Sequence, residues 1–320
     1  MKSFDGKIAV ITGGGSGMGR ELAIQLAVEG SHVAICDVSE ESMAQTRALC
    51  MNRAPKVRVS THLCDVSEER QVLAFRDAVM HAHKTDYIDL LFNNAGIGAG
   101  GSIVVDDREE WDKTFGVCWN GVYFCTRAFL PLLLESDEAH LINTSSVNGF
   151  WASLGPRSAH TAYSAAKFAV KGFTEALIND FRVNAPHIKV SLVMPGHIGT
   201  GIVINSGRFL GRDPKQLTDA QVEDAKKRIQ RLGFPVEGVT NDQIRQGLVA
   251  MAEGFRDNAP MTAEAAAKVI LDGVRAERWR ILVGKDAEVL DRLVRESPEE
   301  AYEESFMQRL TSQVGWNLGV

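Results

Sequence analysis

The sequence of 320 residues has no excess of basic residues: 35 Lys and Arg face 41 Asp and Glu, for a formal net charge of -6. Proteins that bind nucleic acids through their phosphates need positive charge, so this balance argues against a nucleic-acid partner. The sequence also has no apolar run near the roughly 20 residues that cross a bilayer. Residues 129–134, for example, form a much shorter run, and residues 1–6 do not begin a signal peptide. We therefore expect a cytoplasmic protein without a membrane partner.

Cysteine is scarce as well. The five cysteines all lie in the first half of the chain, and none forms a Cys-x-x-Cys pair. This usage is typical of buried thiols in a reducing compartment, and not of a disulfide framework or a zinc site. His81 and His83 are two residues apart on an expected helix and point to different faces, which makes a poor chelate. We therefore predict no metal site.

What the sequence does have is an alternation of short β-branched runs with longer segments of helical period. The expected strands are nearly continuous apolar runs, as in a parallel sheet covered on both faces, and span residues 7–11, 32–36, 57–63, 88–92, 140–143, 188–193 and 280–283. The expected crossover helices span residues 17–29, 40–51, 68–83, 108–134 and 162–182. This rhythm predicts an α/β fold with a doubly wound parallel sheet.

The alternation breaks after Gly196. Residues 201–260 are more polar and rich in Gly, Asp and Gln, and they precede one more expected helix at 263–274. An insertion at this point would lie beyond the carboxyl ends of the strands, over a bound ligand. We expect one domain over residues 1–295, with a lid at about 201–260. Residues 296–320 would form a solvated C-terminal tail or a terminal helix.

A glycine-rich turn follows the first expected strand and reads Thr12-Gly13-Gly14-Gly15-Ser16-Gly17-Met18-Gly19. Glycines let backbone N–H groups approach the phosphates of a dinucleotide, and the start of the next helix adds the positive end of its dipole. The spacing G-x-x-x-G-x-G differs from the more widely found G-x-G-x-x-G. A glycine-rich turn without a ligand is therefore the alternative interpretation.

Asp37 favours the nucleotide interpretation. It ends the second expected strand 18 residues after Gly19, where a carboxylate would bind the hydroxyls of the adenosine ribose. A carboxylate about 4 Å from a 2′-phosphate would repel it by about 4 kcal/mol per charge at an effective dielectric near 20. Residues 31–43 contain no Arg or Lys to offset this repulsion. The sequence therefore favours NAD over NADP, unless Asp37 merely caps the following helix.

Tyr163 and Lys167 lie one turn apart on one face of an expected helix. A phenol has a pKa of about 10, and about 4 kcal/mol from a nearby ammonium would lower it towards 7, where tyrosine becomes a usable acid or base. Such pairs are also common on helices without any function. The alternative is a half-buried tyrosine above a surface lysine.

Taken together, five ordered motifs resemble the short-chain dehydrogenase/reductase family. They are Thr12-Gly-x-x-x-Gly-x-Gly19, Asn93-Asn94-Ala95-Gly96, Asn143-Thr144-Ser145-Ser146, Tyr163-x-x-x-Lys167 and Pro195-Gly196-His197-Ile198-Gly199-Thr200. The resemblance extends from residue 6 to about residue 200. It implies a single Rossmann-fold catalytic domain, and an oxidoreductase that acts as a homodimer or homotetramer.

The resemblance also implies roles for individual residues. Tyr163 would exchange a proton with the substrate oxygen, Lys167 would lower the tyrosine pKa and hold the nicotinamide ribose, and Ser146 would bind the same substrate oxygen. Ser146 is preferred to Ser145 because Ser146-Val147-Asn148-Gly149 matches the family's S-x-x-G. The implied cofactor-binding residues are Thr12, Gly13, Ser16, Gly17, Met18, Gly19, Asp37, Asp65, Val66, Asn93, Ala95, Gly96, Tyr163, Lys167, Pro195, Gly196, Ile198 and Thr200.

One position departs from the family pattern. Where the family has V-N-L-x-G, with the Asn completing a proton relay to the lysine, this chain has Val117-Cys118-Trp119-Asn120-Gly121. Asn120 lies two residues further on, about 200° around a helix, and cannot substitute for the missing side chain. Either a backbone carbonyl and water carry the relay, or proton release is slow. Cys118 itself would be a small filling residue, because no Cys/His arrangement for a nucleophile is visible.

The interval between Ser146 and Tyr163 is longer than usual for the family. It contains Phe150, Trp151, Leu154 and His160, which would border an apolar or aromatic substrate, although ordinary packing of the first two is an equal alternative. His160 and His197 would lie near the substrate or be structural. The small and apolar residues around Tyr163 on the same helix suggest burial against a partner subunit, or beneath the chain's own lid.

The sequence thus predicts an NAD-dependent dehydrogenase that interconverts a small secondary alcohol and a ketone. An NADP-preferring carbonyl reductase is the alternative within the class. A non-catalytic NAD-binding regulatory protein is the alternative outside it, with Cys118 as its only support.

Overall fold

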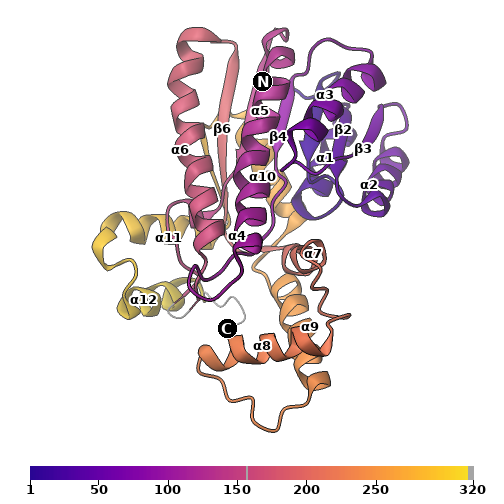
Figure 1. The fold of residues 1–320 in the computed structure, drawn as a ribbon. Helices are drawn as coiled ribbons and strands as arrows, with labels where there is room; N and C mark the ends of the chain where they lie inside the picture. The colour runs from indigo at the N-terminus through magenta and orange to yellow at the C-terminus, as the bar shows by residue number, and fades with distance from the viewer. Residues whose placement is uncertain (156–157, 316–320) are drawn as a thin grey trace.

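Seven parallel strands form one sheet in the order β3-β2-β1-β4-β5-β6-β9 (Figure 1). In the computed structural model, which describes residues 1–155 and 158–315, the strands are β1 Ile8–Thr12, β2 His32–Asp37, β3 Val59–Leu63, β4 Leu90–Asn93, β5 Ala139–Thr144, β6 Ile188–Pro195 and β9 Arg280–Val283. The strand order reverses between β1 and β4, and ligands of such sheets bind outside the carboxyl ends of the strands at this point. The predicted doubly wound parallel sheet is confirmed.

Helices cover both faces of the sheet because neighbouring strand residues belong to two different apolar cores. Ala9 and Ile11 of β1 belong to one core, and Ile8 and Val10 to the other. The helices over the first core are α1 Gly17–Val28, α2 Glu40–Arg53 and α10 Ala263–Arg275, and those over the second are α3 Glu69–His83, α5 Gly121–Leu134 and α6 Thr161–Asn184. This burial on both faces explains the nearly continuous apolar strands.

The predicted helix over 108–134 is continuous but not uniform. It consists of α4 Arg108–Phe115, a π-helical turn at Gly116–Asn120, and α5. By length and composition this is the one helix of the described residues that could cross a membrane. In the fold, however, α5 lies against the sheet, where Cys125 and Phe129 are fully buried. Its apolar character is therefore that of a core helix.

The lid, residues 201–260, contains three helices: α7 Ile202–Phe209, α8 Asp219–Arg231 and α9 Asn241–Asp257. Two of them begin with a capping box, in which Thr218 pairs with Gln221 and Thr240 pairs with Gln243. Such boxes satisfy the free N–H groups of a helix start, so polar segments can still be helical. The short strands β7 Ile198–Gly199 and β8 Met261–Thr262 pair and close the lid at its base. In Figure 1 the lid lies below the sheet.

Ion pairs attach the far side of the lid to the segment around α4. A terminal nitrogen of Arg212 lies 2.7 Å from Glu110 Oε2. A terminal nitrogen of Arg228 in α8 lies 3.2 Å from Asp106 Oδ1. The lid therefore contacts the main body at a second place besides its base.

The C-terminal stretch packs against the loop that follows β5. After α11 Lys285–Glu296 come a 3₁₀ turn at Pro298–Glu300 and α12 Glu304–Val314. Phe306 and Leu310 of α12 are fully buried. The indole N–H of Trp151 donates to the carbonyl of Ala301 at 2.6 Å, and the Trp151 and Phe306 rings lie 5.8 Å apart. This stretch forms a terminal helix, one of the two forms expected from the sequence.

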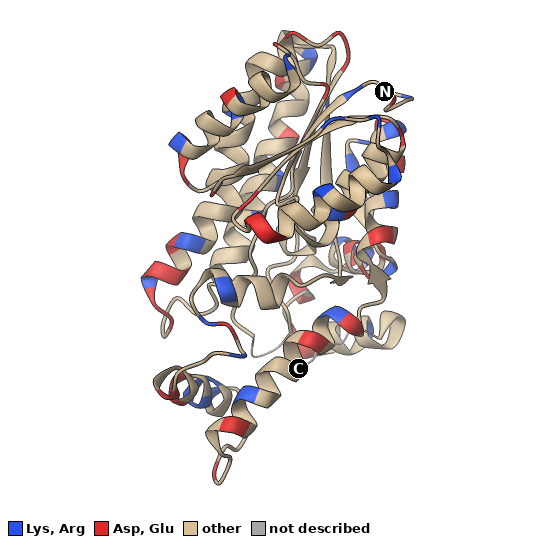
Figure 2. Ribbon diagram, turned by 90° about the vertical axis from the view of Figure 1, so that its right-hand side faces the viewer, with Lys and Arg blue, Asp and Glu red and all other residues tan. Residues whose placement is uncertain are grey.

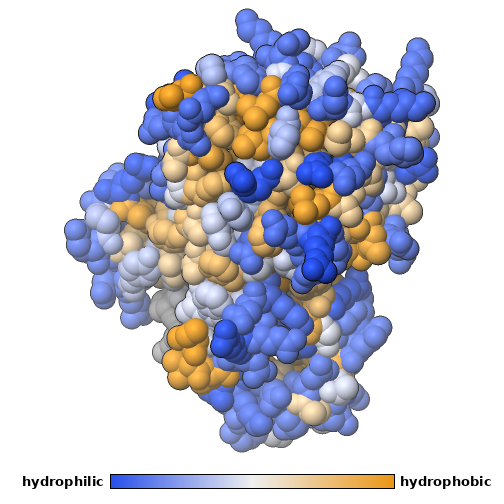
Figure 3. Space-filling view, turned by 45° about the horizontal axis from the view of Figure 1, so that its top comes forward, coloured by the Kyte–Doolittle hydropathy of each residue, from blue (hydrophilic) through white to orange (hydrophobic). Residues whose placement is uncertain are grey.

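Charged side chains of both signs alternate along the outer helices (Figure 2). Many form pairs one helical turn apart, such as Lys171 and Glu175, whose charged atoms lie 2.9 Å apart. Apolar surface occurs in separate patches between the charged ones (Figure 3). Tyr123 of α5 and Phe168 of α6 are among the large apolar side chains with substantial exposure.

Candidate active site

The loop between β1 and α1 has a shape that requires glycine at two positions. Gly13 has a φ of 67° and Gly17 a φ of 52°, both in the left-handed region. A methyl group at Gly19 would lie 2.1 Å from the carbonyl oxygen of Gly13, so α1 starts in close contact with the loop. The hydroxyl of Thr12 accepts the N–H of Asn94 at 3.0 Å and joins the loop to the end of β4. Backbone and helix dipole thus form a cradle that fits the diphosphate of a dinucleotide.

This loop lines a cleft of about 550 Å³ at the carboxyl ends of the strands, a volume typical of small-molecule sites. The residues predicted for the cofactor that line it are Gly13, Ser16, Gly17, Met18, Asp37, Asp65, Val66, Ala95, Gly96 and Thr200. Lining residues that were not predicted are Val38, Ser39, Ser42, Cys64, Asn94, Ile97 and Val117 and, from the lid, Gly201, Ile202, Asn205, Arg208 and Phe209. The lid residues belong to no motif, so the sequence carries no signal for them.

Other predicted cofactor residues support the cleft without lining it. The Asn93 side chain was expected in the cleft, but it is buried below, where its amide donates to Asn143 Oδ1 at 2.8 Å. Pro195 and Ile198 are buried, and Gly196 packs so tightly that a methyl group there would lie 2.2 Å from Asp286 Oδ2.

Asp37 is fixed at the end of β2 by two backbone groups. Its Oδ2 accepts the N–H of Gly15 at 3.0 Å, and its Oδ1 accepts the N–H of Ser39 at 3.2 Å. The fold brings one cation near that the local sequence did not show. This is Arg20, which donates to the Gly15 carbonyl at 2.7 Å and to the Thr46 hydroxyl, and does not line the cleft.

Tyr163, Lys167 and Ser146 meet near Gly96, at one end of the cleft. Lys167 Nζ lies 5.4 Å from the centre of the Tyr163 ring and donates to the Thr144 carbonyl at 2.9 Å. A methyl group at Gly96 would lie 3.5 Å from that nitrogen. The hydroxyl of Ser146 lies near enough to Tyr163 to lower the pKa of the phenol.

Ser145, the alternative to Ser146, has a structural position. Its hydroxyl donates to the carbonyl of Lys167 at 2.8 Å and is buried between β5 and α6. Ser146 is the serine that affects the pKa of Tyr163, and its role at S-x-x-G stays a prediction.

Burial dominates the electrostatics of this group. It raises the pKa of Tyr163 well above its usual value, because a phenolate is costly to desolvate, and the nearby hydroxyl of Ser146 opposes the increase. Burial also lowers the pKa of Lys167. The effect of Lys167 on the tyrosine pKa stays a prediction.

Cys118 lies in the π-helical turn next to the predicted catalytic residues. Its sulfhydryl donates to the Ile97 carbonyl at 3.3 Å, and the residue is fully buried. A methyl group at Gly96 would lie 3.7 Å from the sulfur. The thiol thus fills the space between the loop after β4 and Lys167. π-helical turns are frequently found at functional sites.

The loop after Ser146 does not present its aromatic residues to the cleft. Trp151 is buried against α12, as described above, and Phe150 packs among the buried residues beneath β9. Of the two equal interpretations, ordinary packing is the one that the structure supports.

The two histidines near the site differ in their surroundings. His160 lies against Tyr163, whereas the ring of His197 packs on Phe255 and its Nε2 contacts the Phe255 carbonyl at 2.6 Å. The backbone N–H of His197 donates to the carboxylate of Asp286 at 2.6 Å, and burial raises the pKa of that carboxyl. His197 is therefore structural. No group of three metal-binding side chains occurs among residues 1–155 and 158–315.

Comparisons with known proteins agree with this geometry. The family model of the short chain dehydrogenases matches residues 7–209. This chain belongs to the short-chain dehydrogenase family. It is 35% identical over 295 residues to a Mycobacterium tuberculosis protein named "Putative oxidoreductase SadH", with 92% of each chain covered. It is 34% identical to the levodione reductase of Leifsonia aquatica, covering 69% of this chain and 79% of that protein.

A solved structure is similar over nearly the whole chain. It is a short-chain dehydrogenase from Burkholderia phymatum in complex with NAD, with a TM-score of 0.73 and 32% identity, covering 93% of this chain and 96% of that one. This similarity supports the interpretation of the cleft as a dinucleotide site. The family model ends at residue 209, so most of the lid of this short-chain dehydrogenase, and all of α12, lie beyond it.

Proposed function

We propose that this short-chain dehydrogenase uses NAD to interconvert a secondary alcohol and a ketone, with Tyr163 as the acid and base. The observation that carries the proposal is the grouping of Ser146, Tyr163 and Lys167 beside Gly96, at the end of a dinucleotide-sized cleft. Related oxidoreductases include the levodione reductase above and a meso-2,3-butanediol dehydrogenase of Serratia marcescens.

The nicotinamide ring, when bound, supplies the acceptor or donor of a hydride. In alcohol oxidation the substrate hydroxyl would lie on the oxygens of Ser146 and Tyr163, and its proton would pass to Tyr163. Lys167, held by the Thr144 carbonyl, would favour the charged form of the phenol. In ketone reduction the same groups would return the proton and stabilise the developing alkoxide.

The direct test is Tyr163→Phe. The loss of a positioned acid or base typically costs about 10²- to 10⁴-fold in rate, whereas the cleft residues stay in place. We expect turnover to fall by this amount while the dissociation constant for NADH, measured by fluorescence, stays unchanged. The control is Ser145→Ala, which removes a hydroxyl that has no contact with Tyr163. Normal turnover by the Tyr163→Phe variant would refute the assignment, and no turnover by the wild type on any secondary alcohol would favour a regulatory protein.

The proposed preference for NAD rests on Asp37, which lines the cleft. Residues 31–43 contain no Arg or Lys that would offset its negative charge. We expect tighter binding of NAD than of NADP in separate titrations. Asp37→Asn should reduce the difference between the two dissociation constants, because it removes the charge that repels the 2′-phosphate of NADP. Equal affinity of the wild type for both dinucleotides would support the NADP-preferring reductase instead.

We propose a small, apolar alcohol or ketone as substrate. Since Phe150 and Trp151 pack elsewhere, the support now comes from Ile97, Val117 and Phe209, which line the cleft. A panel of secondary alcohols of increasing chain length, followed by NADH absorbance, tests this choice. A preference for charged substrates would contradict it.

We also propose a cytoplasmic homodimer or homotetramer. Support comes from the outer faces of α5 and α6, where Tyr123 and Phe168 are 39% and 42% exposed. Sedimentation of the wild type should give a dimer or tetramer, and Phe168→Glu should shift it towards monomer. A monomeric wild type would overturn this part of the proposal.

A further inference from the structure

The cleft contains little positive charge for the ligand that it is shaped to bind. A nicotinamide dinucleotide carries a diphosphate with two negative charges, and NADP carries a further 2′-phosphate. The cleft is lined by two carboxylates, Asp37 and Asp65, and among the described residues by one cationic side chain, that of Arg208. The helix dipole and backbone N–H groups of the glycine loop supply only partial charges.

Arg208 comes from the lid, and its helix lies over the glycine loop. The side-chain amide of Asn205 donates to the hydroxyl of Ser16 at 3.1 Å. Thr200, just before α7, is so close to Gly17 that a methyl group on that glycine would lie 3.2 Å from its side chain. Arg208 follows Asn205 by three residues and so projects from the same side of α7. The lid thus brings its arginine to the part of the cleft that is shaped for phosphates.

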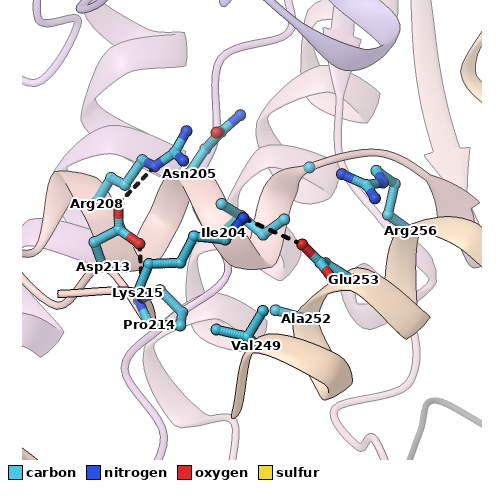
Figure 4. A pocket seen from close by; sticks show the side chains of 11 residues that line it. Ile204, Asn205, Arg208, Asp213, Pro214, Lys215, Val249, Ala252, Glu253 and Arg256 are labelled. Atoms are coloured by element: carbon cyan, nitrogen blue, oxygen red, sulfur yellow. Dashed lines mark hydrogen bonds and ion pairs between the residues drawn. The ribbon is translucent and has the colours of Figure 1, made fainter. Parts of the chain in front are cut away.

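The guanidinium of Arg208 is fixed through its Nε, and its two terminal nitrogens are available to a ligand. Arg208 Nε donates to Asp213 Oδ2 at 2.9 Å, and Asp213 is fixed in turn because its Oδ1 accepts the N–H of Lys215 at 3.0 Å. This ion pair borders a second cavity of about 170 Å³ inside the lid (Figure 4). The terminal nitrogens have no hydrogen-bond partner among the described residues, and Figure 4 shows them on the side of Asn205, away from Asp213. Two free N–H edges of a guanidinium match the oxygens of a phosphate.

We propose that Arg208 binds the diphosphate of the dinucleotide through its terminal nitrogens, with Asp213 as the residue that positions it. The inference rests on the proposed dinucleotide chemistry, but not on the choice between NAD and NADP or on Tyr163. In this arrangement the lid supplies the full positive charge that the glycine loop lacks.

The test measures binding of ADP-ribose, which carries the diphosphate but no nicotinamide, by titration calorimetry. Arg208→Gln should raise its dissociation constant roughly 10-fold, the scale of one hydrogen-bonded charge contact. The matched control is Arg212→Gln, which removes the same charge and also breaks an ion pair of the lid, but does not line the cleft. This control should bind ADP-ribose like the wild type. Arg208→Lys should recover part of the affinity.

Two further readouts separate a binding role from a structural one. The difference between wild type and Arg208→Gln should shrink as NaCl is raised, because a partly exposed charge contact is screened. Asp213→Asn should weaken binding less than Arg208→Gln does. Equal losses in Arg208→Gln and Arg212→Gln, or unchanged ADP-ribose binding in Arg208→Gln, would overturn the inference. Neither result would affect the test of Tyr163, which depends on turnover.

Discussion

The ring of His160 lies against the ring of Tyr163, with the two ring centres 4.7 Å apart. Burial lowers the pKa of His160 to about 4, so the imidazole is neutral near pH 7. Its ring nitrogens have no hydrogen-bond partner in the described part of the chain. The histidine therefore acts on the tyrosine through packing, and not through charge.

Replacing His160 tests this packing role. Aromatic pairs of this kind contribute about 0.5–1.5 kcal/mol beyond their buried area. We expect His160→Phe to keep near-normal turnover because the ring contact remains. His160→Ala should lower kcat by roughly 2- to 10-fold, since Tyr163 loses the neighbour that orients it. If the Phe variant is as slow as the Ala variant in steady-state assays, the nitrogens contact the substrate and the packing argument fails.

Cys118→Asn tests the departure from the family pattern. An Asn amide can donate to the Ile97 carbonyl, as the thiol does now, and it would also restore the side chain that the family pattern has in the proton relay. We expect a higher kcat. Cys118→Ser is the control: it removes the thiol without supplying an amide, so a gain limited to Asn assigns the effect to the proton relay. A lower kcat in both variants, with unchanged thermal stability, would contradict this prediction.

Phe306→Ala tests the link between α12 and the site. Such a truncation of a buried aromatic residue typically costs about 3–5 kcal/mol of unfolding free energy, and here it also removes the ring that supports Trp151. We expect lower stability in urea denaturation together with a raised KM, because Trp151 belongs to the loop that begins at Ser146. Glu304→Gln on the same helix, where the side chain is exposed, should change neither quantity. Loss of stability with unchanged KM would show that the loop holds its shape without α12.

Two buried histidines predict how stability depends on pH. Burial lowers the pKa of His83 to about 4 and that of His140 to about 3, from a usual value of 6.5. Below pH 6.5 the unfolded chain therefore binds protons that the folded chain does not. The unfolding free energy should fall by about 1.4 kcal/mol per pH unit for each histidine between pH 6.5 and about 4.

Urea denaturation at pH 7.5, 6.0 and 5.0 measures this slope. His140→Gln should make it shallower, whereas the exposed His81→Gln should leave it unchanged. An equal slope in the wild type and in His140→Gln would mean that His140 does not stay neutral in the folded protein.

Much of this arrangement could be predicted because it depends on local patterns. Near-continuous apolar strands indicate a parallel sheet, and the glycine spacing and Tyr163-x-x-x-Lys167 fix their own geometry within one or two turns. The helices of the polar insertion were not predicted, although Thr218-x-x-Gln221 is a local capping signal for the start of α8.

What could not be predicted depends on contacts between distant parts of the chain. Trp151 meets a helix 150 residues later, and nothing near it in the sequence indicates this partner. Arg208 belongs to no motif, and contacts such as the bond between Asn205 and Ser16 are needed to show that its helix covers the glycine loop. The burial that raises the Tyr163 pKa could not be predicted for a similar reason, because it is a property of the whole site.

The lid contacts the main body at two places away from its base. Asn205 bonds to Ser16 of the glycine loop, and Arg212 pairs with Glu110 in the segment before α5. Both contacts are polar side-chain pairs near the surface, which water can replace at little cost in free energy. The lid can therefore lose either contact without unfolding a strand or a helix.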